Sequence, residues 1–316
     1  MDEIQLRNFL MISRCSSIAE AADRLGIAQP SLSQQLLRLE DEFGTKLFRR
    51  TSRGVAATDA GRMLQEHAAT ILQSMNRARE EVQGAERVAQ GQVAIGLPGT
   101  ASLILGVPLL ISAKASLPLV NIHVREAMSG TIRRWLEEGR IELGVLYDAE
   151  NFHHLASKTI ARETLLLVGP PGAFGECDAF GIALEPVEQD VLRRQDFILP
   201  SVSHGLRKLI ERQLHMDNLS LSVTTEIDSL AHTKTLVAEG LGYTLLSHAA
   251  IREELASGQL SAAHIARIDL SRKVSFVRNP AQRLTRASIE VEDLATRLLN
   301  DMIADGRWQA SALNEH

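Results

Sequence analysis

The stretch from residue 18 to residue 53 constrains the fold more than any other part of the chain. Its first segment, Ile18–Leu25, has an apolar stripe at helical spacing and is followed by Gly26, and a second helical pattern runs over Gln29–Phe43. Two helices joined by a short turn that contains glycine form a helix-turn-helix. The sequence therefore predicts this motif, with its second helix beginning near Gln29.

The second helix of this pair is expected to have an apolar face and a polar face. Pro30 suits the first helical turn, where its missing N–H costs nothing, and Ser31 or Ser33 is expected to satisfy the free donors there. Apolar residues recur at helical spacing on the core side: Leu32, Leu36, Leu39 and Phe43. Amide, hydroxyl and guanidinium groups can pair with base edges or phosphates, although an ordinary surface helix would look similar. The candidate DNA contacts on this helix are Gln29, Pro30, Ser31, Ser33, Gln34 and Arg38.

A basic segment follows the helix pair. No acid occurs between Glu42 and Asp59, whereas four cations do: Lys46, Arg49, Arg50 and Arg53. A charge run by itself is usually a solvated surface, but beside a helix-turn-helix it is typical of a wing that grips phosphates. Arg53, next to Gly54, suits a minor groove, and Val55–Ala57 is expected to be the return strand of the wing. Arg49, Arg50 and Arg53 are therefore further candidate DNA contacts.

The composition limits the remaining classes of protein. A chain of 316 residues with 45% hydrophobic residues is expected to form two or three globular domains. Its net charge of −5 means that contact with nucleic acid must be local. Cys15 and Cys177 fit no disulfide framework or metal-ligand spacing, so free thiols in a reducing compartment are expected. The acidic N-terminus does not resemble a signal peptide, and we expect no membrane span, which predicts a cytoplasmic protein.

A brace helix and a long helix surround this motif. Ile4–Cys15 predicts a first helix that completes a small core, giving a DNA-binding domain over residues 1–58. From Thr58, a plausible N-cap, to Gln90 the pattern is one long helix, and residues 59–90 are interpreted as a linker and dimerisation helix. Its apolar residues alternate spacings of four and three, as in a coiled coil, although one amphipathic helix on a large domain would look alike. The candidate dimer contacts are Leu64, Ala68, Ile71, Met75, Ala78 and Val82.

After Gly91 strands and helices alternate, which predicts a sheet with parallel strands and helices on its faces. Two α/β lobes are expected within residues 91–304, followed by a tail over 305–316. Lobe I is assigned to 91–162 and 268–304, and lobe II to 163–267. The chain would then cross between the lobes near 161–163 and 266–268, around a hinged cleft. The predicted fold class is α/β multidomain, with a winged helix-turn-helix, a long helix and a two-lobed domain with mixed sheets.

Two segments resemble a known family. Residues 18–61 resemble the N-terminal region of LysR-type transcriptional regulators, and residues 129–145, SGTIRRWLEEGRIELGV, resemble their effector domain. Within that family, residues 91–102 and 226–247 are most similar to the nitrogen-assimilation-control subgroup, although Ser247 stands where members commonly have proline. The resemblance implies a winged helix-turn-helix, a linker helix and a periplasmic-binding-protein-like effector domain. It also implies a homodimer or homotetramer on double-stranded promoter DNA and contact with RNA polymerase.

An effector is expected in the cleft between the lobes. Carboxyl ends of strands and amino ends of helices meet there, and hydroxyls with free N–H groups suit a small anion. Each serine could instead be only a helix cap, and His204 could be structural. The subgroup resemblance also implies a regulator that needs no small-molecule inducer, with side chains filling the cleft. The candidate effector-binding residues are Gly99, Thr100, Ser102, Ser129, Ser201, Ser203 and His204.

No catalytic or cofactor motif is recognisable in the sequence. It lacks the G-x-S-x-G and phosphate-loop patterns, and Gly240-Leu-Gly242 lacks the third glycine of a dinucleotide fingerprint. The adjacent His153 and His154 do not have metal-ligand spacing. We therefore predict a regulator that is not an enzyme and has no cofactor, metal or membrane partner. The rival is a two-lobed solute receptor or enzyme whose N-terminal unit contacts protein, which would need neither the basic wing nor the polar helix face.

Overall fold

The computed structural model describes residues 1–51, 54–83, 88–149, 152, 154–282 and 284–312. The contacts within it divide the chain into two compact units, residues 1–87 with 138–140 and residues 88–137 with 141–316. Each unit has its own hydrophobic core, so the two are described separately.

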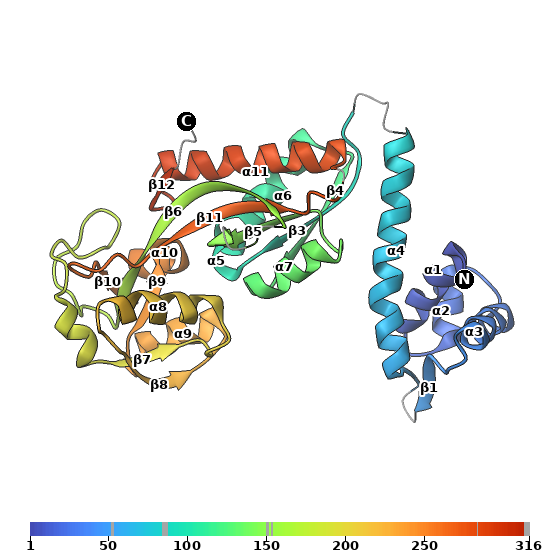
Figure 1. The fold of residues 1–316 in the computed structure, drawn as a ribbon, viewed down its shortest axis with the longest axis horizontal. Helices are drawn as coiled ribbons and strands as arrows, with labels where there is room; N and C mark the ends of the chain where they lie inside the picture. The colour runs from blue at the N-terminus through green and yellow to red at the C-terminus, as the bar shows by residue number, and fades with distance from the viewer. Residues whose placement is uncertain (52–53, 84–87, 150–151, 153, 283, 313–316) are drawn as a thin grey trace. The chain divides into compact units, whose positions relative to one another are not determined.

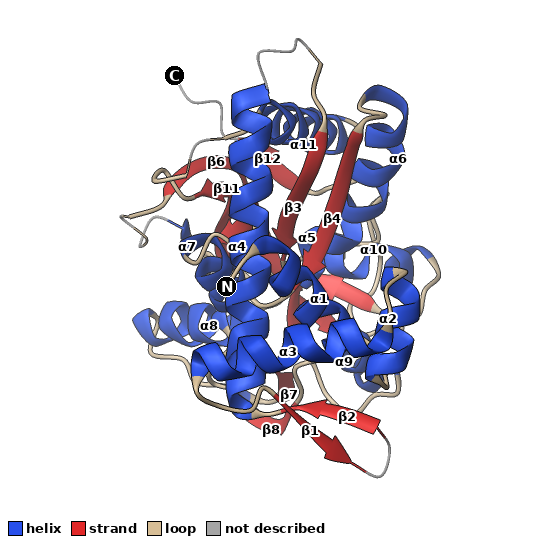
Figure 2. Ribbon diagram, turned by 90° about the vertical axis from the view of Figure 1, so that its right-hand side faces the viewer, coloured by secondary structure: helices blue, strands red, loops and turns tan. Residues whose placement is uncertain are grey.

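The N-terminal unit is a winged helix-turn-helix followed by a long helix. Ser17 caps α2 by accepting a hydrogen bond from the Glu20 N–H at 3.1 Å, and Gly26, in the left-handed region, ends this helix. Figure 2 shows the β1–β2 hairpin as two short arrows at one end of the unit. The elements are α1 (Glu3–Ser13), α2 (Ile18–Leu25), α3 (Gln29–Phe43), β1 (Phe48–Thr51), β2 (Gly54–Ala57) and α4 (Asp59–Gln83).

Two glycines let the wing pack closely on its own unit. A Cβ on Gly54, whose φ is 119°, would lie 2.0 Å from the Ser16 carbonyl oxygen. A Cβ on Gly61, in the first turn of α4, would lie 2.1 Å from the Leu47 carbonyl oxygen. Thr58 caps α4 as predicted, because its hydroxyl oxygen accepts the Gly61 N–H at 3.0 Å. The wing is thus fixed to both the α1–α2 turn and the start of α4.

The structure corrects two expectations for α3. Phe43, predicted on the core side with three leucines, is 45% exposed, because it is the last residue of the helix before Gly44 ends it. The N-cap position is Ala28, and no side chain caps this end, so neither Ser31 nor Ser33 has the predicted capping role. In the first turn Pro30 has no N–H, and the Ser31 N–H donates to the Ala28 carbonyl at 3.0 Å, so few donors are left for a cap.

Part of the predicted dimer seam of α4 is buried within its own unit. Leu64 and Ala68 are 7% and 0% exposed, because α4 packs against α1 and buries these side chains in the core of its own unit. Ile71 is half-buried against the same core. Met75 and Ala78 are exposed, and the side chain of Val82 lies outside the described residues. The first half of the apolar stripe of α4 therefore packs within one copy of the chain. The described part of the helix runs to Gln83, and residues 88–90 are not helical.

Lobe I of the C-terminal unit is a mixed sheet with helices on both faces. Strands β4, β3 and β5 are parallel neighbours, and β11 pairs antiparallel with β5. Side chains of α6 and α11 share one core with β3 and β5, whereas α7 packs on the other face (Figure 1). The elements are β3 (Gly91–Leu97), α5 (Gly99–Ala101), a π-helical turn (Ser102–Gly106), α6 (Val107–Ser116), β4 (Val120–Glu126), α7 (Ser129–Glu137), β5 (Leu143–Tyr147), β11 (Ser271–Arg278), α11 (Arg286–Ala304) and β12 (Ala310–Ala312).

Lobe II is joined to lobe I by one long strand. β6 (Ala156–Gly169) pairs with β11 through its first half and with β9 and β10 through its second half. The return crossing lies beside it, since the Leu165 N–H donates to the Leu270 carbonyl at 2.7 Å. The elements of lobe II are β7 (Asp196–Leu199), α8 (Gly205–Met216), β8 (Ser222–Glu226), α9 (Leu230–Ala238), β9 (Thr244–Ser247), α10 (His248–Ala256) and β10 (Ser261–Ala263).

The helical run over residues 99–116 corrects the expectation that no segment approaches a membrane span. By length and composition it is apolar enough to cross a membrane. Leu105, Leu109 and Ala113 pack in the lobe I core, which is the position of a core helix in a globular domain. The opposite side of the run is also apolar and faces solvent. Its exposed side chains are Leu103, Val107, Leu110 and Ile111.

Candidate DNA-binding face and interlobe pocket

The polar face of α3 is exposed along its length. The core side of the helix is closed by Leu32, Leu36 and Leu39, which are buried. Ser33 is half-buried at the edge of this core, and the other predicted contacts are exposed: Gln29, Pro30, Ser31, Gln34 and Arg38. The helix therefore presents amide, hydroxyl and guanidinium groups together on one side, with an uncapped amino end that favours a phosphate.

A buried carboxylate holds the wing against α3. Glu40 is buried, and its Oε1 accepts the backbone N–H groups of Leu47 at 2.9 Å and Phe48 at 3.3 Å. Its Oε2 accepts from Lys46 Nζ at 2.6 Å, and this hydrogen bond raises the pKa of Lys46. Lys46 is thus partly neutralised, whereas Arg49 on β1 is exposed. The side chain of Arg50, and Arg53 altogether, lie outside the described residues.

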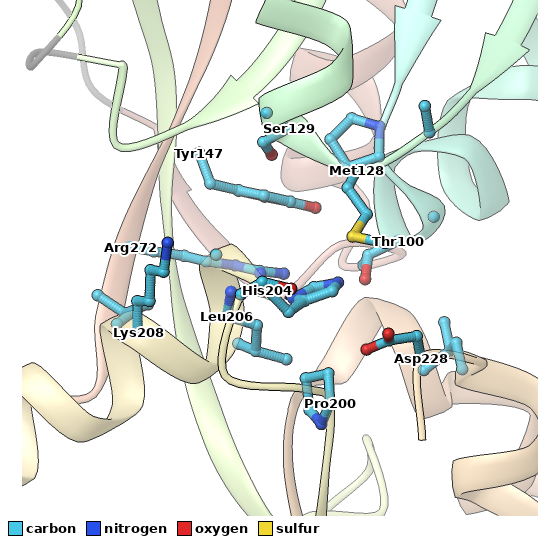
Figure 3. A pocket seen from close by; sticks show the side chains of 18 of the residues that line it. Thr100, Met128, Ser129, Tyr147, Pro200, His204, Leu206, Lys208, Asp228 and Arg272 are labelled. Carbon is cyan, nitrogen blue, oxygen red and sulfur yellow. Dashed lines mark hydrogen bonds between the residues drawn. The ribbon is translucent and has the colours of Figure 1, made fainter. Parts of the chain in front are cut away.

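The C-terminal unit contains a cavity of about 810 Å³ between its two lobes. The carboxyl ends of β3, β4 and β5 and the start of α7 line it from lobe I, and α8 with the residues after β7 and β8 line it from lobe II (Figure 3). Five predicted effector residues are among its lining: Gly99, Thr100, Ser129, Ser203 and His204. Ser102 and Ser201 are not. The cavity is open, so the expectation of a cleft filled by side chains is not met.

Two of the predicted residues have other roles. The Ser201 hydroxyl donates to Asp228 at 3.0 Å, and the Ser201 N–H donates to the same carboxylate at 2.9 Å. These bonds, the backbone one first, lower the pKa of Asp228. Ser129 is the first residue of α7 rather than its cap, because the helical bonds already begin at the Met128 carbonyl.

The floor of the pocket is a buried ion pair that the sequence analysis missed. Arg272, at the start of β11, lines the pocket and is 5% exposed. Its Nε donates to Glu163 Oε1 at 2.7 Å, and its guanidinium lies 3.5 Å from the ring centre of Tyr147. Glu163 on β6 is 1% exposed and also accepts the Trp308 Nε1–H at 2.9 Å. Arg272 therefore connects the pocket with both strands that run between the lobes, β11, on which it lies, and β6, which carries Glu163.

Tyr147 lies between Arg272 and Ser129 in the pocket (Figure 3). Burial raises the pKa of Tyr147 to about 12, although the neighbouring Arg272 charge opposes the rise. The phenol is therefore a neutral hydroxyl at physiological pH. Its hydrogen-bond partners are Thr100 and the backbone of Ala101, so the predicted Thr100 hydroxyl is already engaged.

Charged side chains of both signs line the pocket, and its carboxylates are those of Glu126, Asp148 and Asp228. Glu126, at the end of β4, has a carboxylate oxygen 3.7 Å from where a Cβ on Gly99 would stand. An anion is therefore less favoured at the start of α5 than the sequence indicated. Lys208 and Arg212, one turn apart on α8, and Arg133 on α7 line the pocket from its two lobes. These cations could not be recognised from the sequence, since solvated helix faces have the same composition.

Family comparisons agree with this architecture. A model of the LysR substrate binding domain matches residues 86–299, and a model of the bacterial regulatory helix-turn-helix proteins of the lysR family matches residues 4–62. The chain belongs to the LysR family. It is a LysR-type transcriptional regulator with a DNA-binding and an effector-binding domain, and not an enzyme.

Several LysR-type proteins are similar over nearly the whole chain. The nitrogen assimilation regulatory protein nac of Klebsiella aerogenes is 29% identical over 297 residues, which is 94% of each chain. The regulator BbuR of Bordetella bronchiseptica is 31% identical over 262 residues, 83% of this chain and 79% of that protein.

The solved structures that match establish the fold. Full-length CbnR in complex with its target DNA has a TM-score of 0.69 at 18% identity, covering 94% of this chain and all of that one (100%). A full-length variant of OxyR from Pseudomonas aeruginosa has a TM-score of 0.68 at 19% identity and covers 100% and 99%. Both agree with a helix-turn-helix unit followed by a two-lobed domain.

Proposed function

We propose that this LysR-type regulator reads double-stranded promoter DNA with α3 in the major groove and grips phosphates with the wing. The observation that carries the proposal is the exposed polar face of α3 with its uncapped amino end, next to a wing fixed by Glu40. Gln29, Ser33 and Gln34 would read base edges, and Arg49 would contact a phosphate. A protein of this kind would work in the cytoplasm, and contact with RNA polymerase is the expected route to altered transcription.

A second copy of the chain would supply the second DNA-binding domain that a two-fold site requires. Two-fold DNA recognition needs two reading heads at a fixed spacing, and LysR regulators act as oligomers. Because Leu64 and Ala68 are buried within one copy, only Met75 and Ala78 of the described seam are exposed, and a further apolar surface would enlarge the dimer contact. The exposed side of the run over residues 99–116 offers one, beside the open edge of the sheet at β4. A second copy packed there would cover side chains that otherwise stay in water.

A small anionic effector would occupy the pocket between the lobes. The open volume of about 810 Å³ is in the range of ligand sites. Its anionic end would lie near Lys208 and Arg212 of α8, away from the carboxylates of Glu126 and Asp228. Contact with Arg272 would carry ligand binding to the crossing strands and change the angle between the lobes.

The DNA assignment is tested by salt-dependent binding to a promoter fragment that the protein occupies in cells. Arg49→Ala should weaken binding to specific and unrelated DNA alike and reduce the slope of log K against log salt by about 1. Gln34→Ala should instead reduce discrimination between the two, by roughly 1–3 kcal/mol if it makes a bidentate contact.

The matched control is Arg307→Ala, which removes the same charge from the C-terminal unit and should leave both quantities unchanged. If Arg49→Ala binds like the wild type, or no more weakly than this control, the wing is not a phosphate contact.

A further inference from the structure

His204 is held in one orientation by the start of α8. It is the N-cap of that helix, and its Nδ1 accepts the Leu206 backbone N–H at 3.1 Å. A ring nitrogen that accepts a hydrogen bond carries no proton. Burial lowers the pKa of His204, the Asp228 charge opposes this and the Arg272 charge adds to it, and with the net shift downward the ring is neutral at physiological pH. The single ring proton therefore lies on Nε2.

This Nε2–H is a fixed donor directed at the pocket. Figure 3 shows the half-buried ring between Arg272 and Asp228. Asp228, beside the ring, accepts two bonds from Ser201, and Glu163 accepts bonds from Arg272 and Trp308. Among the described residues the structure gives Nε2 no acceptor.

A second unsatisfied group lines the same pocket. Thr244 on β9 is 1% exposed, and its hydroxyl has no hydrogen-bond partner within the part of the chain that the structure describes. A buried hydroxyl of this kind is costly unless a ligand or water completes it. Lys208 and Arg212 reach the pocket from the same helix that His204 caps, and neither has an ion pair with a described residue. A donor, a hydroxyl and two cations thus line the pocket from lobe II.

We propose that His204 is a specificity-determining residue of the effector site, and that its Nε2–H donates to an oxygen of a carboxylate or similar oxyanion on the effector. Lys208 and Arg212 neutralise the charge of that group, and the Thr244 hydroxyl completes the lobe II side. The inference rests on the effector pocket proposed above and names the chemistry that this pocket accepts. An ammonium or another donor in this position would leave Nε2–H unpaired, which disfavours such ligands.

Two substitutions separate the donor from the helix cap. His204→Asn keeps a short side-chain oxygen that can cap α8 but has no donor at the position of Nε2. His204→Gln extends an amide N–H to about that position. The full-length protein and both variants are titrated calorimetrically with sodium succinate and, separately, sodium sulfate, with sodium chloride holding the ionic strength constant. Thermal unfolding is recorded for each protein.

Wild type should bind at least one of the two anions saturably. His204→Asn should weaken that binding by about 10-fold or more, as expected for a lost hydrogen bond to a charged acceptor, at an unchanged melting temperature. His204→Gln should stay within about 3-fold of wild type. Absence of saturable binding of both anions, or equal binding by wild type and His204→Asn, would overturn the proposal. Promoter binding is measured on the same samples. If the wild type binds promoter DNA but the anion result fails, only this inference is wrong, whereas loss of promoter binding in the wild type would count against the proposed regulator function.

Discussion

Replacing Arg272 with methionine tests the buried ion pair at the floor of the pocket. The substitution removes the guanidinium that bonds Glu163 and stacks on Tyr147, and leaves a 1% exposed carboxylate with only the Trp308 N–H as a donor. Breaking a buried pair by removing one partner costs about 3–5 kcal/mol, because the remaining charge stays desolvated. That is a large share of the roughly 5–15 kcal/mol by which domains are stable.

The double variant Glu163→Gln with Arg272→Met should recover most of this loss. It leaves no charge buried at this position, and the amide oxygen that Glu163→Gln introduces can still accept the Trp308 N–H. The cost should therefore fall to about 1–2 kcal/mol. The difference in the free energy of unfolding between the single and double variants measures the cost of leaving the Glu163 carboxylate buried and unpaired, rather than the cost of lost side-chain volume.

Urea unfolding followed by tryptophan fluorescence is a suitable assay. The chain has two tryptophans, Trp135 and Trp308, and both lie in the C-terminal unit, so the signal reports on that unit. With a slope of about 3 kcal/mol per molar urea, the single variant should lose roughly 1–2 M in its midpoint at equal protein concentration. A single variant within about 1 kcal/mol of wild type, or a double variant no more stable than the single one, would refute the reasoning.

Three further predictions concern other parts of the molecule. Glu40→Ala should free the Leu47 and Phe48 N–H groups, speed their hydrogen exchange and weaken DNA binding, whereas unchanged exchange would mean that Glu40 does not hold the wing. Ile111→Asp should shift sedimentation toward a smaller species and the exposed-site control Ser116→Asp should not, and equal sedimentation would remove this face from the interface. Burial lowers the pKa values of His204 and His248 in the folded protein, so the unfolded chain binds more protons below about pH 6.5. The stability of the C-terminal unit should therefore be present above about pH 6.5 and fall as the pH drops below it, and urea midpoints that are equal at about pH 7.5 and 5.5 would contradict this sign.

The helix-turn-helix was predictable to the residue because its boundaries are local. Ser17 and Gly26 bound α2, and Gly44 ends α3, in each case through backbone geometry that a neighbouring side chain or a glycine sets by itself. The order of elements in the two lobes was predictable for the same reason. The course of β6 was not, because its first half, with Lys158, Arg162 and Glu163, has a polar pattern and is fixed by pairing with a strand more than a hundred residues later.

The remaining errors arose because the sequence does not show which side chain each predicted residue contacts. The spacing of Leu64 and Ala68 in α4 is the same whether the opposite surface is a second copy or α1, and α1 is the surface present within the chain. Thr100 and Ser201 stand at element ends as predicted, but Tyr147 and Asp228 occupy their hydroxyls. The most consequential pocket residue, Arg272, gave no sequence signal, because one arginine in an apolar strand does not reveal the carboxylate that pairs with it.

Genome-wide mapping of the DNA that the protein occupies in cells tests the central claim most directly. Wild type should be enriched at discrete promoter sites that share a two-fold symmetric motif, and a variant carrying Gln29→Ala and Gln34→Ala should lose that motif while keeping its abundance. Arg307→Ala serves as the control and should reproduce the wild-type sites. Wild-type occupancy without a shared motif, or an unchanged motif in the α3 variant, would contradict the account of α3 as the element that reads the promoter.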